Sequence, residues 1–321
     1  MSDVYIETSG AGLVYNSDIE LIDFLRKSRD YLEFPGLKIY DNIPEEFPYS
    51  IKYFDVQDRN ILCSDKEIKI YYPSNNLTAA SIVFMGYILM ERQRNEQSMV
   101  TIHSACVEKN NSAILLLGRT GSGKTTLSLN LCDKYNYSLI GNDRNIIGFN
   151  SNGELTAFDG TRFLFLRYES IKRNMPELLD LFPEEKKDSW LRKVKVLPED
   201  LGIKTTSNVP ITKSYIIHVD NSSKELYCIN GDNAANRLYL NELFSMYIRG
   251  MYTTFSDKNF NAIGYVPSYD TAQCYKNRAE LINAVFTISN LEYVSGNLSD
   301  ISEYINEKQK TLVYRKDGGR F

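Results

Sequence analysis

Residues 113–126 read AILLLGRTGSGKTT, in which an apolar run enters a loop rich in glycine. Gly118, Gly123, Lys124 and Thr125 occupy the fixed positions of the pattern G-x-x-x-x-G-K-[ST]. The unbroken apolar run is typical of a strand buried on both faces, and the residues after the glycines suit an amphipathic helix. Strand, loop and helix agree, so the stretch predicts a phosphate-binding loop (P-loop) and not a chance glycine turn.

The loop expected to hold the phosphates comprises Gly118, Arg119, Thr120, Gly121, Ser122, Gly123, Lys124, Thr125 and Thr126. Glycines let the backbone curl so that N–H groups point at phosphate oxygens, and the positive end of the following helix attracts the same charge. We expect Lys124 to reach the β and γ phosphates and Thr125 to offer its hydroxyl to Mg²⁺. ATP and Mg²⁺ are therefore the expected cofactors.

The composition is that of an ordinary globular chain of 321 residues, with 43% hydrophobic and 24% charged residues. A formal net charge of −4 provides no overall basic field for nucleic acid. The amino terminus lacks the pattern of a signal peptide, and the longest apolar stretch, residues 79–90, is too short to cross a bilayer. We therefore expect a cytoplasmic protein without a nucleic-acid or membrane partner; the sequence leaves open whether it forms a homo-oligomer.

The cysteines indicate neither a disulfide framework nor a metal site. There are five, far apart and without a CxxC pair, and the chain has only two histidines. An odd number of scattered cysteines in a cytoplasmic protein is typical of reduced, mostly buried thiols.

Two regions are expected along the chain. Short strands, turn signals and helices at 19–30 and 79–94 predict a mixed α/β N-terminal region. The polar run 91–97 predicts the boundary, which gives residues 1–97 and 98–321 as the two domains. The second is expected to be the α/β P-loop catalytic domain.

Within the second domain the patterns alternate between strand and helix. The stretch 168–200, which is charged, punctuated by prolines and contains Trp190, fits either a mobile lid or a solvated helical insertion. The patterns predict strands at 100–107, 112–117, 137–140, 214–219 and 225–229, and helices at 124–134, 235–250, 278–286 and 298–309.

A P-loop requires an acidic partner on a neighbouring strand to hold the metal or its waters. Asp143 and Asp220 each follow an apolar strand, and either could be that residue or could cap a turn at the strand end. No NKxD motif follows the loop, which disfavours a GTPase, and the VSGNL of residues 294–298 resembles an ABC signature only loosely.

A histidine in front of the loop supplies a family resemblance. His103 lies in the strand IHSACV, residues 102–107, fifteen residues before Gly118. With the loop and the YSLIGND of residues 137–143, this segment resembles the catalytic domain of HPr kinase/phosphorylase and its relatives. The resemblance is specific over about residues 100 to 150. It implies a P-loop kinase core of the HPr kinase and phosphoenolpyruvate-carboxykinase type.

The resemblance favours Asp143 over Asp220 as the metal-site carboxylate, together with Thr125. In that family an Asp-Asp pair ends the strand after the P-loop helix; here the first acid is replaced by Asn142, which cannot take a proton. Thr126 stands where HPr kinases tend to carry an acid. The chain therefore resembles a divergent relative, a group that includes kinases of small-molecule serine and of peptides.

Further residues are candidates with a structural alternative. His103 could activate the acceptor or could be a structural strand residue. Arg144 and Arg162 could clamp phosphate or an acidic acceptor, or could be surface arginines.

These patterns lead to one principal hypothesis and two rivals. The principal hypothesis is an ATP-dependent kinase that transfers the γ-phosphoryl group to a hydroxyl of a small molecule, peptide or protein serine. In it Lys124 binds the phosphates, and His103 or Asp143 activates the acceptor. The first rival is a nucleotide-binding regulatory or assembly ATPase without phosphotransfer, which Asn142 would favour. A carboxykinase reaction is less favoured because the sequence shows no cluster of metal-binding histidine and lysine.

Overall fold

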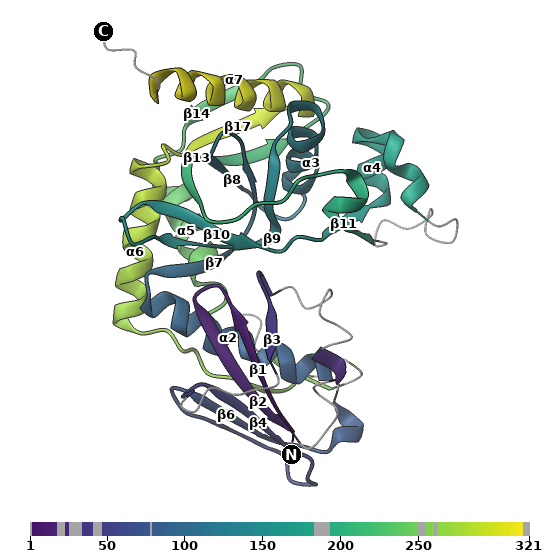
Figure 1. The fold of residues 1–321 in the computed structure, drawn as a ribbon, viewed down its shortest axis with the longest axis vertical. Helices are drawn as coiled ribbons and strands as arrows, with labels where there is room; N and C mark the ends of the chain where they lie inside the picture. The colour runs from purple at the N-terminus through teal and green to yellow at the C-terminus, as the bar shows by residue number, and fades with distance from the viewer. Residues whose placement is uncertain are drawn as a thin grey trace. The chain divides into compact units, whose positions relative to one another are not determined.

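The computed structural model describes residues 2–17, 23–25, 34–40, 47–77, 79–182, 193–249, 254–257, 259 and 262–316. It is a mixed α/β structure in which both large sheets combine parallel and antiparallel strand pairs (Figure 1). The chain divides into two compact units. One consists of Met1–Ile102 with Leu238–Ile282, and the other of His103–Arg237 with Asn283–Phe321.

The first unit is built on a six-stranded sheet of order β3-β1-β2-β4-β6-β5. Within it β2, β4 and β6 run parallel, and the other neighbours are antiparallel. The elements that lie wholly in this unit are β1 (Ser2–Thr8), β2 (Ala11–Ser17), β3 (Lys38–Tyr40), β4 (Ser50–Phe54), β5 (Asn60–Cys63), β6 (Glu67–Tyr71), η1 (Ser74–Asn76), α2 (Ala79–Glu96), β15 (Thr254–Ser256) and β16 (Ala262–Tyr265).

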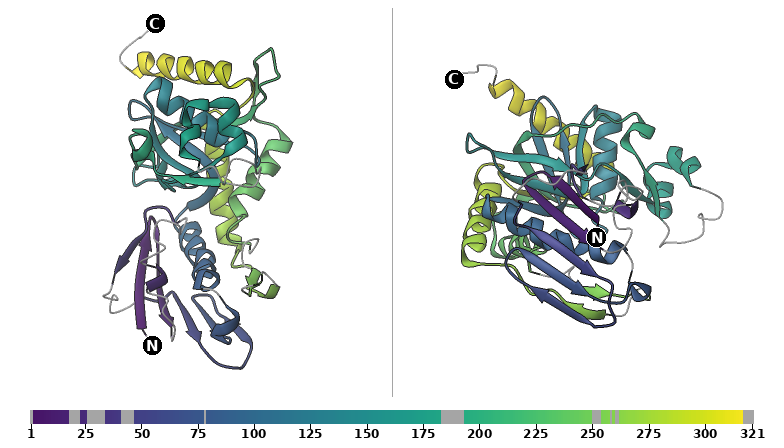
Figure 2. Two further views of the ribbon diagram at one scale, coloured as in Figure 1. Left: turned by 90° about the vertical axis from the view of Figure 1, so that its right-hand side faces the viewer. Right: turned by 60° about the horizontal axis from the view of Figure 1, so that its bottom comes forward.

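The helix α2 covers one face of this sheet (Figures 1 and 2). In β4 and β6 buried residues alternate with half-buried ones, as expected of strands with one face in a core. The hydroxyl of Tyr15 donates to the carbonyl of Val83 on the helix at 2.6 Å. Gly86 allows this close approach, because a Cβ atom there would lie 2.1 Å from the same hydroxyl.

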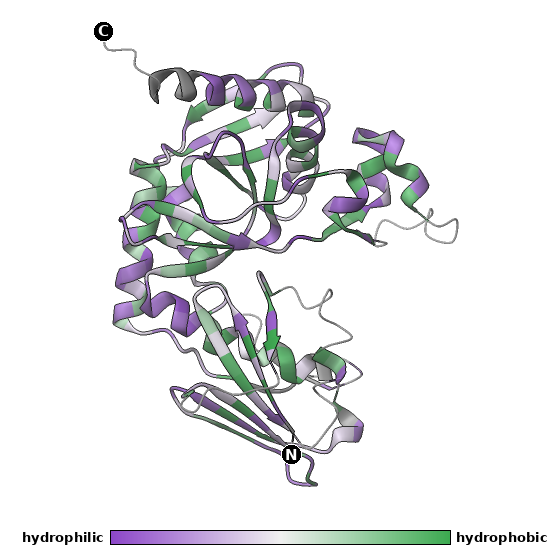
Figure 3. Ribbon diagram, in the orientation of Figure 1, coloured by the Kyte–Doolittle hydropathy of each residue, from purple (hydrophilic) through white to green (hydrophobic). Residues whose placement is uncertain are grey.

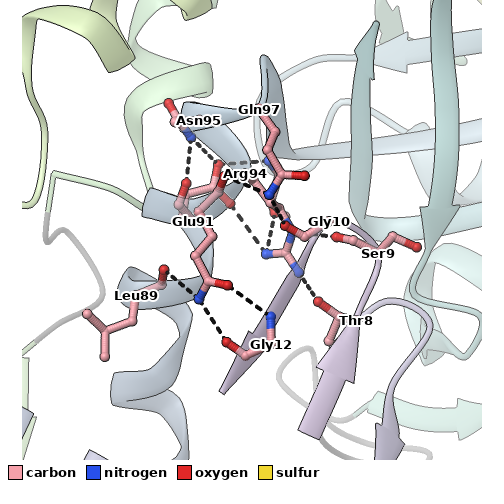
Figure 4. Close-up of polar contacts among 11 residues, drawn as sticks. Thr8, Ser9, Gly10, Gly12, Leu89, Glu91, Arg94, Asn95 and Gln97 are labelled. Atoms are coloured by element: carbon pink, nitrogen blue, oxygen red, sulfur yellow. Dashed lines mark hydrogen bonds and ion pairs between the residues drawn. The ribbon is translucent and has the colours of Figure 1, made fainter. Parts of the chain in front are cut away.

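The polar run 91–97, predicted as a domain boundary, instead comprises the last six residues of α2 and Gln97, and most of its helical residues are buried (Figure 4). Glu91, Arg94 and Asn95 are fully buried. The Arg94 guanidinium donates to the hydroxyl of Thr8 at the end of β1 and to the carbonyl of Ser9 in the turn that follows, and it lies 3.6 Å from Glu91. The partners of Arg94 at Thr8 and Ser9 are distant in sequence, whereas Glu91 pairs with Arg94 within the helix. The division between the units falls after Ile102.

Arg94→Met is expected to lower the free energy of unfolding of the protein by about 3–5 kcal/mol, because it leaves Glu91 as a buried charge without its partner. Urea unfolding measures the change. A matched control is Lys69→Met, since Lys69 pairs with Glu67 at 3.0 Å on the surface, where an ion pair contributes little to stability. Equal losses in the two variants would contradict the assignment of Arg94 as a buried structural charge.

The second unit is built on a seven-stranded sheet of order β10-β9-β7-β8-β13-β17-β14. Parallel pairing joins β8, β13 and β17, and β10 also pairs with the start of β13. The elements that lie wholly in this unit are β8 (Ala113–Leu117), α3 (Lys124–Tyr135), β9 (Ser138–Phe149), β10 (Leu155–Gly160), β11 (Leu164–Arg167), α4 (Tyr168–Asn174), η2 (Pro176–Leu181), β12 (Lys193–Val196), η4 (Pro198–Leu201), β13 (Val209–Val219), β14 (Tyr227–Asn230), β17 (Glu292–Gly296) and α7 (Leu298–Lys316).

The core of this unit lies between the sheet and the helices α3 and α7. All five residues of β8 are buried, as its apolar run predicts. The helix α7 is largely hydrophilic in Figure 3 but buries Leu298, Ile301 and Ile305 against the same core. This packing fixes the end of β8 and the start of α3, between which the glycine loop lies.

Three elements cross the division between the units: β7 (Met99–Glu108), α5 (Ala234–Ser245) and α6 (Ala272–Thr287). The sequence placed everything after residue 97 in one domain, whereas Leu238–Ile282 groups with the first unit. The contacts that bring this segment back join residues far apart in the chain, such as the side-chain amide of Asn277 with the carbonyl of Asn95 at 2.7 Å. No local sequence pattern reports such contacts.

Most predicted elements within the described residues are present, but several are longer than predicted, among them β9, α6 and α7. The described residues between 164 and 196 form the two-stranded pair β11–β12 with α4 and η2. Trp190 and most of the helix expected at 19–30 lie outside the described residues. No helix in the described part of the chain has the length and apolar character needed to cross a membrane.

Candidate phosphate-binding site

The loop between β8 and α3 has the backbone conformation that its glycines predict. Gly118, Gly121 and Gly123 have φ angles of 149°, 84° and 92°, a region that side-chain-bearing residues rarely adopt. At Gly118 a Cβ atom would lie 2.9 Å from the carbonyl oxygen of Ile217, and at Gly123 it would lie 2.5 Å from Val219. The loop is therefore pressed against β13, and larger residues at these two positions would displace it.

The exposed tip of the loop is formed by Arg119, Thr120 and Gly121. Ser122 turns inward: its side chain is buried, and its hydroxyl has no hydrogen-bond partner in the described part of the chain. The backbone carbonyl of Ser122 accepts a hydrogen bond from the N–H of Val219 at 2.9 Å. The loop thus has a fixed base on β13 and a tip open to solvent, from which a ligand can approach.

Lys124 is a buried cation at the first position of α3. Its side chain is 7% exposed, and its ammonium donates to the carbonyls of Gly118 at 2.7 Å and Arg119 at 3.2 Å. It forms no ion pair with a described residue. Burial lowers the pKa of Lys124 to about 8, and the charge of Asp143 opposes this only in part. A buried ammonium held by carbonyls alone, at the positive end of a helix, makes a site that attracts anions.

The two threonines after Lys124 contact different elements. The hydroxyl of Thr125 donates to the side-chain oxygen of Asn142 on β9 at 2.9 Å. The hydroxyl of Thr126 lies 3.0 Å from that of Ser170 on α4. Thr125 was predicted to hold a metal ion together with Asp143. The contacts of the two threonines with Asn142 and Ser170 were not predicted from the sequence.

The strand that carries Asp143 is longer than predicted. The expected strand ended at residue 140, whereas β9 runs to Phe149, so Asp143 lies within the strand and not at its end. The N–H of Asn142 donates to the carbonyl of Thr161, and the N–H of Thr161 donates to the carbonyl of Arg144. Asp143, with a φ angle of 67°, is left over between these two bonds. The left-handed backbone at Asp143 is thus an irregularity in the pairing at this end of β9, of a kind that can redirect one side chain.

The redirected Asp143 faces His103 on β7. One carboxylate oxygen of Asp143 lies 3.8 Å from Nδ1 of the imidazole, and both side chains are about 30% exposed. Burial lowers the pKa of His103 below its usual value, and the charges of Lys124 and Arg144 add to this, while Asp143 opposes it. The imidazole is therefore neutral at pH 7 and able to accept a proton.

The remaining candidates lie in different surroundings. The side chain of Asp220 accepts hydrogen bonds from the N–H and hydroxyl of Ser222, which is the turn-capping alternative considered for this residue. Arg162 is 44% exposed and lies 3.6 Å from Asp159. Within the described part of the chain, the hydrogen bonds of Asp220 and the ion pair of Arg162 involve Ser222 and Asp159, and not Lys124, Thr125 or His103. Arg144 acts on the site through its charge, because it lowers the pKa of His103.

The described residues contain no group of three or more histidine, cysteine, aspartate or glutamate side chains that could hold a metal ion by themselves. The oxygen donors near the loop are the hydroxyl of Thr125, the carboxamide of Asn142 and the carboxylate of Asp143. Hard oxygen donors of this kind suit Mg²⁺, which usually takes one or two protein ligands and completes its shell with phosphates and water. The residues present fit that mode of binding and not an all-protein cage.

Comparison with known proteins leaves the family of this chain open. No protein-family model and no curated protein matches the sequence. Among solved structures, the HPr(Ser) kinase/phosphatase from Coxiella burnetii matches with 10% sequence identity and a TM-score of 0.31, covering 68% of this chain and 99% of that one. Similarity at this level does not establish a shared function.

Proposed function

We propose that the chain is an ATP-dependent kinase with an HPr-kinase-like P-loop core. In this proposal residues 118–126 bind the phosphates of ATP, and the γ-phosphoryl group is transferred to a hydroxyl acceptor. The observation that carries the proposal is the buried ammonium of Lys124, which has only carbonyl partners and a pKa lowered to about 8. Bound phosphates would supply the negative charge that the ammonium lacks.

The loop supports phosphate binding in two further ways. The N–H groups at the start of α3 have no partners within the helix and carry its positive dipole end. The glycine backbone at Gly121 is open, with no atom within 4 Å of the position a Cβ atom would occupy. A polyphosphate could therefore lie close to the main chain, as a P-loop requires.

Thr125 and Asp143 are the residues proposed to hold Mg²⁺, with the phosphates as further ligands. When bound, the ion would neutralise charge on the transferred phosphoryl group. Asn142 keeps the Thr125 hydroxyl in one orientation by accepting its hydrogen, so the lone pairs of the hydroxyl oxygen remain available.

His103 is the proposed general base, with Asp143 beside it. In the proposed reaction the proton of the acceptor hydroxyl passes to the neutral imidazole, and the acceptor oxygen forms a bond to the γ phosphorus. The bond from that phosphorus to the bridging oxygen breaks, and ADP leaves. Asp143, 3.8 Å from Nδ1, would stabilise the imidazolium that forms.

Transfer of label from ATP labelled in its γ-phosphate to a panel of serine-containing peptides, free serine and sugar alcohols tests this proposal. Label on a hydroxyl compound supports a kinase. Tight binding of ATP without transfer or turnover would support the alternative, a nucleotide-binding regulatory or assembly protein, which the carboxamide of Asn142 favours because it cannot take a proton.

Asp143→Asn is expected to reduce Mg²⁺-dependent transfer at least about tenfold, since an amide lacks the charge that a metal site requires. The matched control is Asp220→Asn, which should change the rate by less than about twofold, because the turn with Ser222 tolerates asparagine. Initial rates at several Mg²⁺ concentrations measure both variants. An inactive Asp220 variant beside an active Asp143 variant would mean that the metal strand is β13 and not β9.

The affinity for ATP is expected to fall as the pH rises above about 8. In the free protein Lys124 loses its proton near that pH, whereas bound phosphates favour the charged form, so binding must take up a proton at higher pH. Below about pH 8 the affinity should be flat. Lys124→Arg, which stays charged, should bind more weakly but show no such fall. Isothermal titration between pH 7 and 9.5 measures the profile, and identical profiles for the two proteins would contradict the assignment.

A further inference from the structure

Asn142 has a buried hydrogen-bond donor that no described residue satisfies. The side chain is 1% exposed; its Oδ1 accepts from Thr125 at 2.9 Å, and its Nδ2 has no partner in the described part of the chain. Buried amide groups in native proteins nearly always have partners, because an unsatisfied one costs free energy. The missing acceptor is therefore expected to belong to a bound molecule.

The side chain cannot leave this position without disturbing the strand. The N–H of Asn142 is fixed to the carbonyl of Thr161 at 2.7 Å. Directly before it, Gly141 lies so close to Gly160 that a Cβ atom at Gly141 would be 2.3 Å from the Cα atom of Gly160. Two backbones in contact on one side and the Thr125 hydroxyl on the other hold the carboxamide in place.

The surroundings of Nδ2 identify the kind of acceptor. Nδ2 and Oδ1 belong to the same carboxamide, so Nδ2 lies close to the hydroxyl of Thr125. Thr125 directly follows the buried Lys124 at the N-terminal, positive end of α3. An N–H group in a region of positive potential pairs with an anion and not with a metal ion. A phosphate oxygen is the acceptor that fits the proposed function of the loop.

The strand that carries Asn142 indicates which phosphate. The loop 118–123 is expected to surround the inner phosphates, whereas Asn142 approaches from β9 and immediately precedes Asp143, which faces His103. The group that reacts beside His103 is the terminal phosphate. We infer that Nδ2 of Asn142 donates to an oxygen of that terminal phosphate, so that Asn142 makes the site select nucleoside triphosphate over diphosphate. This inference rests on the proposed function.

Binding of Mg²⁺ with ADP and with a non-hydrolysable ATP analogue, measured by isothermal titration, tests the selection. Asn142→Asp should weaken binding of the triphosphate by about tenfold or more, because it replaces a donor by a negative charge while keeping the acceptor for Thr125. Binding of ADP should change by less than about threefold. Asn142→Ala should also weaken binding of the triphosphate, but by a smaller factor. Asn150→Asp, the same substitution just beyond the end of β9, should change neither affinity.

The two proposals fail in different ways. If the wild-type protein binds neither nucleotide, the proposed function is wrong and the inference falls with it. Suppose instead that the wild-type protein binds nucleotide. If both Asn142 variants then show equal losses of affinity for ADP and for the triphosphate, or no loss for either, the inference alone is overturned. Thermal melting of the free proteins reports folding. If Asn142→Asp lowers the melting temperature, the affinities of Asn142→Ala test the inference instead, because that variant introduces no buried charge and removes an unsatisfied donor.

Discussion

Lys124→Ala is expected to reduce phosphoryl transfer by about 10³-fold or more while the protein stays folded. Groups that stabilise charge in a transition state commonly account for about 10²–10³ in rate each, and Lys124 is both the buried cation of the loop and the residue expected on the transferred phosphate. Binding of ATP should weaken in parallel. Single-turnover rates with excess enzyme and equilibrium titration measure the two effects separately.

Lys124→Met is the control that separates a functional loss from an unfolded protein. It keeps most of the side chain and removes only the charge. Because the pKa of Lys124 is lowered to about 8, the charged form at pH 7 costs the folded state free energy, and the wild-type stability should rise with pH between about 8 and 10.5. The methionine variant should therefore melt at the same or a higher temperature and lose that dependence. A variant that transfers phosphate at the wild-type rate would remove the loop from the mechanism.

His103→Gln is expected to reduce the rate of transfer by about 10²-fold or more, the scale of losing a general base. With the wild-type protein the single-turnover rate should rise with pH and reach a plateau, since the neutral imidazole is the active form. Burial and the charge of Lys124 lower the pKa of His103, so the rise should be centred below the unperturbed value of about 6.5. In the glutamine variant the rise should disappear.

The control for this profile is the other histidine of the chain. His218 lies on β13 and is exposed, so His218→Gln should leave both the rate and the profile as in the wild-type protein. An unchanged rate in His103→Gln would assign His103 to the structural role that the sequence left open, and Asp143 would then act alone.

The sequence predicted the strand, loop and helix of residues 113–135 well because that signal is local. The apolar run becomes the buried β8, and the glycines take the positive φ angles that the loop requires. The prediction failed for β9, because the strand was expected to end at residue 140 with Asp143 at its end, whereas β9 continues to Phe149. The N–H of Asn142 instead donates to the carbonyl of Thr161, which lies 19 residues further along the chain, and the N–H of Thr161 donates to the carbonyl of Arg144. No pattern over a few residues indicates such a partner.

The same distinction explains the candidate site. His103 and Asp143 could be named because a family resemblance joins two segments, and the structure brings them to 3.8 Å. The bond between Thr125 and Asn142 could not be named, because an asparagine at that place read only as a missing acid. The burial of Glu91 and Arg94 was missed for a related reason, since charged residues in a row are typical of solvent-exposed helix ends.

The central claim is that residues 118–126 hold the phosphates of a nucleoside triphosphate. A crystal structure with Mg²⁺ and a non-hydrolysable ATP analogue tests it most directly. The account predicts phosphate oxygens at the N–H groups that begin α3, and the ammonium of Lys124 moved from the carbonyl of Gly118, where it lies at 2.7 Å, to the phosphates. A nucleotide bound elsewhere on the chain, with Lys124 still on Gly118 and the glycine loop empty, would contradict it.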